Sequence, residues 1–261
     1  FTLKAGSVCD PDFYLGAKVR KVTLKNGRTA YGMSPSKYVQ AAVNNVTTHL
    51  KKKGLSLPKR ASAPFVTGYQ PEIDVTPTLN DEDANFFMSQ IGVLRWMVEL
   101  GRIDIAVEVS MLSSHMALPR EGHMEALLHV YAYLKNKHNS RIVFDPTPLD
   151  IDMDNFKPNL EWKRIYGDVK EAIPPNAPPP RGNPVTLMIF CDSDHAGEKA
   201  TRRSRTGFFV HMNNSPIVWH SKKQATVETA VFGAEFVALK TAMECNRGLR
   251  YKLRMMGVPI E

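Results

Sequence analysis

The sequence has few cysteines and no long hydrophobic run, and both shortages exclude whole classes of protein. Its 261 residues contain three cysteines, Cys9, Cys191 and Cys245, and none has the spacing of a zinc or redox motif. A disulfide-stabilised secreted fold is therefore excluded, and a reducing compartment is expected. No apolar run approaches the roughly 18 residues that a membrane-spanning helix needs, so no membrane contact is expected. The chain begins with Phe1 and no signal peptide follows, so we expect a piece of a longer polypeptide.

Acidic residues are outnumbered, and the imbalance is concentrated near the C-terminus. Lys and Arg total 34 against 26 Asp and Glu, which gives a net charge of +8. Residues 195–261 hold eleven Lys or Arg, five Glu and no Asp. A basic surface of this kind favours polyanions such as nucleic acids as partners.

Composition divides the chain into three parts. Residues 174–180 read PPNAPPP, a stiff and extended stretch that lacks most backbone donors. We therefore place the boundaries so that 1–148 and 182–261 form separate domains. Residues 149–181 form a linker that is first acidic and then rich in proline.

The pattern before the linker predicts a β-hairpin and then helices. Residues 13–23 alternate apolar and polar side chains, and Lys25-Asn26-Gly27-Arg28 predicts a tight turn into a strand over 29–33. Helical periodicity follows over 35–49, 81–100, 104–116 and 119–137, with Asn80 as the expected cap of the second helix. Short joints between amphipathic helices predict a small bundle.

After the linker, the pattern predicts three strands and one long helix. Strands are expected over 185–191, 207–212 and 217–220, and the helix over 229–256. The helix should place Phe232, Phe236, Leu239 and Met243 against the sheet. The fold class is therefore α/β (α+β overall), with a mostly helical N-terminal part and a C-terminal sheet covered by a helix.

Carboxylates lie where such a sheet would carry chemistry. Asp192 and Asp194 come directly after the first predicted C-terminal strand, and Glu235 lies on the predicted inner face of the long helix. A carboxylate on a core-facing stripe is costly unless it is paired or binds a metal. Oxygen ligands suit Mg²⁺ or Mn²⁺. The alternative is that Asp192 caps a turn and Glu235 forms an ion pair with Arg203 or Lys222.

Several runs of sequence resemble copia-type retrotransposon polyproteins. Those after the linker are similar to the ribonuclease H domain of that family, namely 191–197 (CDSDHAG), 202–207 (RRSRTG), 216–224 (PIVWHSKKQ) and 233–239 (GAEFVAL). Those before the linker resemble the end of its reverse transcriptase palm and its thumb helices, namely 14–16 (YLG), 34–38 (SPSKY), 91–96 (IGVLRW), 101–105 (GRIDI) and 133–135 (YLK). The agreement is co-linear over 13–144 and 186–259.

The resemblance implies metal-dependent hydrolysis of the RNA strand of RNA–DNA hybrids, on a ribonuclease H-like mixed sheet. Asp192 matches the first metal-binding Asp of the family and Glu235 its helix Glu, with Mg²⁺ or Mn²⁺ as cofactor and Asp194 as a further acid. An intracellular location follows, in the cytoplasm, a virus-like particle or the nucleus. Contacts with the hybrid backbone would come from seven polar residues: Arg202, Arg203, Ser204, Ser221, Lys222, Lys223 and Gln224.

The chain also departs from the family. It contains no Tyr-x-Asp-Asp polymerase motif, and no Asp follows Asp194 to serve as the third metal-binding acid. We therefore expect low hybrid cleavage from these residues alone. The alternative function is a catalytically incomplete fragment that positions a template–primer duplex. The first C-terminal strand, over 185–191, would expose an apolar edge, so self-association through that edge is expected.

A weaker pattern lies in the linker. Asp150, Asp152, Asp154 and Glu161 have part of the spacing of a calcium loop, but Asn155 stands where that loop needs glycine. A solvated acidic linker is the preferred interpretation.

Overall fold

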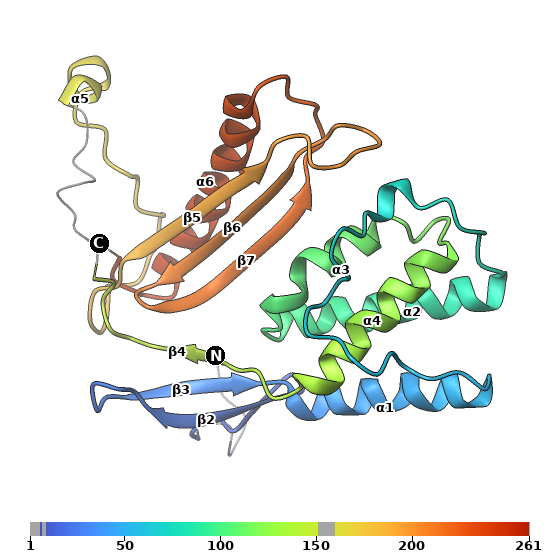
Figure 1. The fold of residues 1–261 in the computed structure, drawn as a ribbon. Helices are drawn as coiled ribbons and strands as arrows, with labels where there is room; N and C mark the ends of the chain where they lie inside the picture. The colour runs from blue at the N-terminus through green and yellow to red at the C-terminus, as the bar shows by residue number, and fades with distance from the viewer. Residues whose placement is uncertain (1–5, 7–8, 151–159, 261) are drawn as a thin grey trace.

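The computed structural model describes residues 6, 9–150 and 160–260, and within them the chain is a mixed α/β protein with two antiparallel sheets (Figure 1). The N-terminal sheet has the order β1–β2–β3–β4, and the C-terminal sheet has the order β5–β6–β7. The strands are β1 (Phe13–Tyr14), β2 (Ala17–Thr23), β3 (Thr29–Ser34), β4 (Ile142–Phe144), β5 (Leu187–Asp194), β6 (Arg205–Met212) and β7 (Ser215–Lys223). The α-helices are α1 (Ser36–Lys52), α2 (Asp81–Glu99), α3 (Ala106–Ser113), α4 (Glu121–Asn136), α5 (Leu160–Tyr166) and α6 (Val231–Met255).

The predicted N-terminal hairpin is confirmed as β2 and β3, and the structure adds two strands to it. The strand expected over 13–23 is divided, because β1 turns back at residues 15–16 and pairs antiparallel with β2. In the tight turn between β2 and β3, the Asn26 side chain accepts a hydrogen bond from the Arg28 N–H at 3.0 Å, and Gly27 has a φ of 78°. Such a φ suits glycine because it has no Cβ to clash. β4 pairs antiparallel with β3, although it follows the helical bundle in the chain. This non-local pairing left no turn signal in the sequence.

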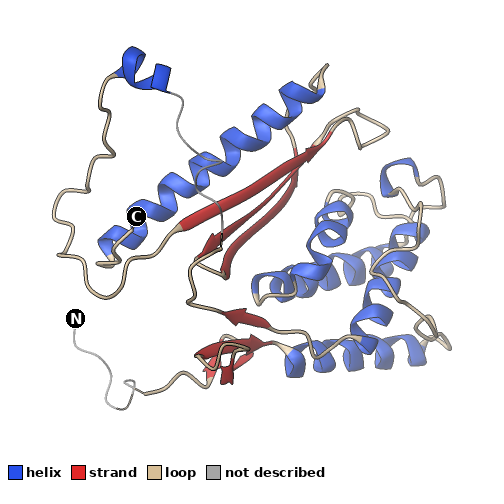
Figure 2. Ribbon diagram, turned by 60° about the vertical axis from the view of Figure 1, so that its left-hand side comes forward, coloured by secondary structure: helices blue, strands red, loops and turns tan. Residues whose placement is uncertain are grey.

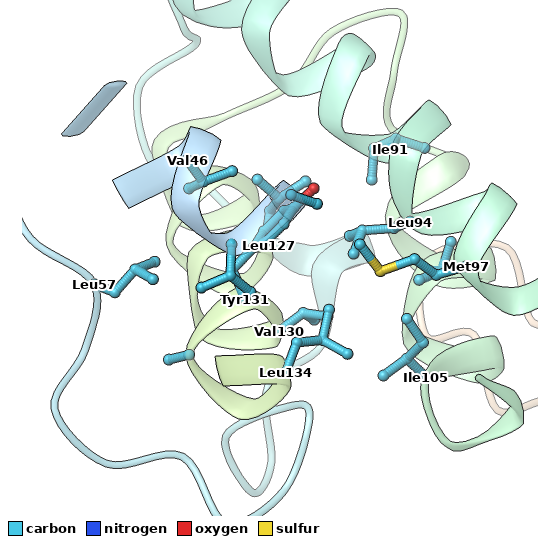
Figure 3. Close-up of a cluster of buried hydrophobic side chains, with 14 of the residues drawn as sticks. Val46, Leu57, Ile91, Leu94, Met97, Ile105, Leu127, Val130, Tyr131 and Leu134 are labelled. Atoms are coloured by element: carbon cyan, nitrogen blue, oxygen red, sulfur yellow. The ribbon is translucent and has the colours of Figure 1, made fainter. Parts of the chain in front are cut away.

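The predicted helical bundle is confirmed, and its core is continuous. Asn80 caps α2 as expected, because its side chain accepts a hydrogen bond from the Asp83 N–H at 2.9 Å. We call α1, α2, α3 and α4 together the helical part. Their apolar faces meet in one cluster of buried hydrophobic side chains (Figure 3). Its fully buried members include Phe87, Ile91, Leu94, Ile105, Leu127, Tyr131 and Leu134.

The C-terminal sheet is a three-stranded meander with α6 on one face (Figure 2). The predicted strands and helix are confirmed, but the predicted inner face of the helix is wrong. Ala234, Ala238 and Ala242 are the fully buried residues of α6, and they recur every four positions. The stripe expected to face the sheet is exposed instead, with Phe232 79% and Phe236 58% exposed; Leu239 and Met243 are exposed too. Small side chains let the helix axis approach the strands closely, and the large ones are left outside.

β5 has a largely open outer edge in the described residues. β6 occupies its other edge along its whole length. On the open side, Val185 forms an isolated parallel bridge with Ile260, and the Val185 N–H donates to the Pro259 carbonyl at 2.9 Å. The chain beyond α6 thus returns to the edge of β5 just before that strand begins. Self-association through this edge stays a prediction.

The helical part packs against β7, the opposite edge strand of the C-terminal sheet (Figure 1). The indole Nε1 of Trp219 donates to the Val98 carbonyl of α2 at 3.0 Å. The Ser110 hydroxyl of α3 donates to the Ser221 carbonyl at 2.7 Å and lies 2.7 Å from Nη1 of Arg205, which donates to it. These bonds join the two parts that the sequence predicted as separate domains.

The prediction that no membrane is contacted and the calcium pattern of the linker both stay untested. Among the described helices, none is long and apolar enough to cross a membrane. Asp152 and Asp154, which the calcium pattern requires, lie outside the described residues, so that pattern stays untested.

An ion pair between Arg102 and the partly exposed carboxylate of Asp104 stabilises the junction between α2, α3 and α4. Arg102 is fully buried, and its Nε and Nη2 donate to the two carboxylate oxygens of Asp104 at 2.8 and 2.6 Å. The Tyr133 hydroxyl of α4 donates to the same carboxylate at 2.9 Å. Burial raises the pKa of Asp104, but the hydrogen bonds and charge of Arg102, with Tyr133, outweigh it, and the net pKa is lowered.

Replacing this carboxylate should destabilise the fold in a pH-dependent manner. Asp104→Asn leaves Arg102 buried without its counter-ion, so we expect a loss of about 3–5 kcal/mol in the free energy of unfolding at pH 7. Because the folded-state pKa is lowered, the contribution is present above the unfolded pKa and is lost as pH falls through the folded one. Urea unfolding at pH 7 and at acid pH measures both effects. The control is Asp10→Asn, which removes an exposed pair with Lys21; equal losses in both variants would contradict the assignment.

Candidate metal centre and nucleic-acid interface

Two of the predicted acids converge at the end of β5. The Ser193 N–H donates to Oδ1 of Asp192 at 2.9 Å and to Oε1 of Glu235 at 3.3 Å. The two carboxylate oxygens are therefore separated by no more than the sum of those lengths. Asp192 reaches this point from the strand and Glu235 from α6, next to the buried Ala234.

The thiol of Cys191 lies close to both carboxylates. Burial raises the pKa of Cys191, and the negative charges of Glu235 and Asp192 raise it further. Both carboxylates therefore act on one point of the strand. In the described residues, neither Arg203 nor Lys222 forms the ion pair with Glu235 that the alternative interpretation required.

The carboxylates of Asp192 and Glu235 could supply some, but not all, of the ligands of a divalent cation. Carboxylate oxygens are the ligands that Mg²⁺ and Mn²⁺ prefer, and Asp192 and Glu235 could hold such an ion. No group of three or more His, Cys, Asp or Glu residues in the described part of the chain could complete a metal cage. The structure therefore supplies two ligands of a site that needs more.

The Asp194 carboxylate bonds to the start of β6 and does not join the carboxylate of Glu235. Its side chain accepts a hydrogen bond from the Arg205 N–H at the start of β6. A Cβ on Gly197 would collide with its Oδ2, so the carboxylate packs tightly against that turn. Partial burial raises the pKa of Asp194, and Asp192 raises it as well, against the lowering effect of Arg205. Its geometry suits a positioning role for the turn that follows β5.

The seven residues predicted to contact nucleic acid differ in their exposure to solvent. Arg202 and Lys222 are exposed, whereas Arg203, Ser221 and Lys223 are half-buried. Lys223 is paired with Glu198 at 2.7 Å. Arg202 and Lys222 thus have the exposed, unpaired charge that a phosphate contact requires.

For two of the seven, burial contradicts a direct contact. Ser204 is fully buried, and its hydroxyl accepts a hydrogen bond from the Ala196 N–H at 3.0 Å. Gln224 is 5% exposed, and its Nε2 donates to the Ala234 carbonyl at 2.9 Å and to the Thr206 hydroxyl at 3.1 Å. These polar side chains hold the turn after β5 and the start of α6 in place, which a basic sequence context could not reveal.

A basic cleft that the sequence analysis missed lies in the N-terminal part. It has a volume of about 350 Å³ and lies between β2, β3, the start of α1 and the segment before β4. Four cations line it, Lys18, Arg20, Lys37 and Arg141, and no carboxylate does. Lys18 and Arg20 share one face of β2 because strand side chains alternate, a pairing that period-two analysis could have found. Arg141 comes from far along the chain and left no signal.

Comparisons with known proteins support a coarse assignment. No family model matches the chain, and no solved structure does. The retrovirus-related Pol polyprotein from transposon RE1 of Arabidopsis thaliana is 23% identical over 86% of this chain, which spans 12% of that protein. The Pol polyprotein from transposon TNT 1-94 of Nicotiana tabacum is 22% identical over 79% of the chain, which spans 13% of it. These relatives support a retrotransposon polyprotein.

A relative with a different description is also similar. The secreted RxLR effector protein 161 of Plasmopara viticola is 24% identical over 60% of this chain, which covers 87% of that protein. The retrotransposon relatives align with a larger share of this chain, and they imply enzymatic domains in general.

A substitution of Gln224 tests whether this residue supports the fold and does not contact nucleic acid. Gln224→Ala removes two buried hydrogen bonds, so we expect the free energy of unfolding to fall by about 1–3 kcal/mol. Affinity for an RNA–DNA hybrid, measured by fluorescence anisotropy on folded protein, should not change. Lys222→Ala is the matched control, because that exposed residue should leave stability unchanged and lower affinity. An affinity loss in Gln224→Ala without a loss of stability would restore the original prediction.

Proposed function

We propose that this chain is part of a retroelement replicase whose C-terminal sheet performs ribonuclease H-type hydrolysis of the RNA strand of RNA–DNA hybrids. The convergence of Asp192 and Glu235 on the Ser193 N–H supports this proposal most directly. The antiparallel order β5–β6–β7, with α6 on one face and the parallel bridge at Val185, also agrees with a ribonuclease H-like sheet. The retrotransposon relatives make a nucleic-acid substrate the natural one.

The chemistry divides between the cation and the chain. A bound Mg²⁺ or Mn²⁺ ion would supply activation of a water molecule and stabilisation of the leaving oxygen. Asp192 and Glu235 would hold the ion at the end of β5. The Ser193 N–H restrains both carboxylates, and the basic residues Arg202 and Lys222 would hold the phosphate backbone.

Metal binding tests the nuclease assignment. We expect Mn²⁺, followed by electron paramagnetic resonance, to bind weakly to the chain, because two carboxylates give an incomplete cage. Asp192→Asn and Glu235→Gln should each abolish this binding, since each removes half of the charged ligands. Glu228→Gln is the matched control, because Glu228 precedes α6 and its carboxylate accepts from the Thr226 hydroxyl instead.

Two outcomes would contradict the assignment. Binding that survives Glu235→Gln, or that Glu228→Gln also abolishes, would place the ion elsewhere. Hybrid cleavage by these 261 residues should stay low, as the missing third Asp implies. Efficient Mn²⁺-dependent cleavage that Asp192→Asn abolishes would show that two carboxylates suffice.

The basic cleft favours a second function, the positioning of a template–primer duplex. Lys18, Arg20, Lys37 and Arg141 are brought together with no carboxylate among the lining residues, so their charge is available to phosphates. This function needs no metal and would persist if the nuclease were inactive.

Loss of charge from the basic cleft should weaken duplex binding in a salt-dependent way. The double change Arg20→Gln and Arg141→Gln removes two cations, so the slope of log affinity against log salt should fall by about two units. Fluorescence anisotropy of a labelled duplex at several salt concentrations measures it. Exposed Lys51 and Lys52 lie at the end of α1, and their double change to Gln is the control. Equal slopes for both double variants would contradict a localised site.

A further inference from the structure

A second polar cleft lies between the helical part and the C-terminal sheet. Its volume is about 500 Å³, and its walls come from α2 and α3 on one side and from β7 on the other. The hydrogen bonds from Trp219 to Val98 and from Ser110 to Ser221 join these walls. The cleft is therefore already formed in the free chain.

Both walls present groups that suit phosphates. Arg95 of α2 and Lys222 of β7 are exposed lining residues, and neither forms an ion pair within the described part of the chain. Ser113 and Ser114 also line the cleft, but their hydroxyls donate to the Val109 and Ser110 carbonyls of α3, so Arg95 is the phosphate-binding group of that wall. Glu99 is the one carboxylate among the lining residues, so the unpaired charge is positive on balance.

One lining group is a buried donor without a partner. Ser221 lies in the wall of the cleft, and its hydroxyl is shielded from solvent, yet this hydroxyl has no hydrogen-bond partner among the described residues. An unsatisfied buried hydroxyl is costly, and a bound acceptor would relieve that cost. A phosphate oxygen is such an acceptor.

The strand register connects this cleft to the candidate metal centre. Ser221 pairs with Gly207 on β6, and Gly207 pairs with Asp192 on β5, so the three residues form one row across the sheet. Adjacent strands lie about 4.8 Å apart, which puts Ser221 about 10 Å from Asp192. A Cβ on Gly207 would meet a single atom, the His220 carbonyl oxygen at 3.9 Å, so the middle of the row is open. A phosphodiester backbone could follow the row from the cleft to the carboxylates in about two nucleotides.

We infer that this cleft binds the phosphodiester backbone of the nucleic acid whose scissile bond reaches Asp192. The inference rests on the proposed nucleic-acid substrate and extends it, because it assigns a backbone contact to Arg95 of the helical part. The helical part and the C-terminal sheet then hold one strand together, and their packing sets the path of that strand.

Binding measurements without metal test this inference separately from the nuclease chemistry. The probe is a fluorescent RNA–DNA hybrid, titrated with the full chain in EDTA at several salt concentrations. Arg95→Gln and Lys222→Gln should each weaken binding severalfold, and the double variant should lower the salt slope by about two units. Gly207→Thr places a side chain that strands tolerate in the middle of the row. It should weaken binding but lower the salt slope less than the double variant does, because it removes no charge.

Matched controls keep the result specific. Arg60→Gln and Lys240→Gln remove the same charge from exposed positions, in the loop after α1 and on α6, and should leave affinity nearly unchanged. Wild-type affinity in Arg95→Gln and Lys222→Gln, or equal losses in all four variants, would overturn the inference. If the chain binds no Mn²⁺ but the variants change hybrid binding as expected, the nuclease assignment is rejected and the assignment of the cleft stands.

Discussion

The close packing of α6 on the C-terminal sheet is the constraint on which the candidate centre depends. Three alanines, Ala234, Ala238 and Ala242, form the buried face of the helix and allow it to approach β5 and β6. This approach brings the Glu235 carboxylate to the Ser193 N–H, where Asp192 also lies. Larger residues on this face would separate helix and strand, and the two carboxylates would move apart. The position of one helix thus decides whether the acids share a ligand.

A second consequence concerns the two parts of the chain. The helical part closes the β7 edge of the C-terminal sheet, and Asp192 lies at the opposite edge on β5, with Glu235 of α6 beside it. Positive charge lines two clefts, one beside β7 and the basic cleft near β2. Substrate contacts on both parts are the simplest use of this arrangement for a retroelement protein.

Local patterns predicted what depends on local interactions. The turn at Asn26 and Gly27, the cap at Asn80 and the buried stripe of α2 were all predicted, because each arises from neighbouring residues. The inner face of α6 was not predicted. Periodicity identifies the most apolar stripe of a helix, whereas the structure buries the stripe with the smallest side chains. β4 was missed because the whole helical bundle separates it in sequence from its partner β3. The resemblance to copia-type polyproteins identified Asp192 and Glu235, but it could not show that Ser204 and Gln224 are buried supports.

Anomalous scattering from crystals of the chain soaked in Mn²⁺ tests the central claim most directly. We expect a peak at the end of β5, bound by carboxylate oxygens of both Asp192 and Glu235. A structure in which these two side chains point apart, with no peak between them at high Mn²⁺ concentration, would show that they do not form a metal site.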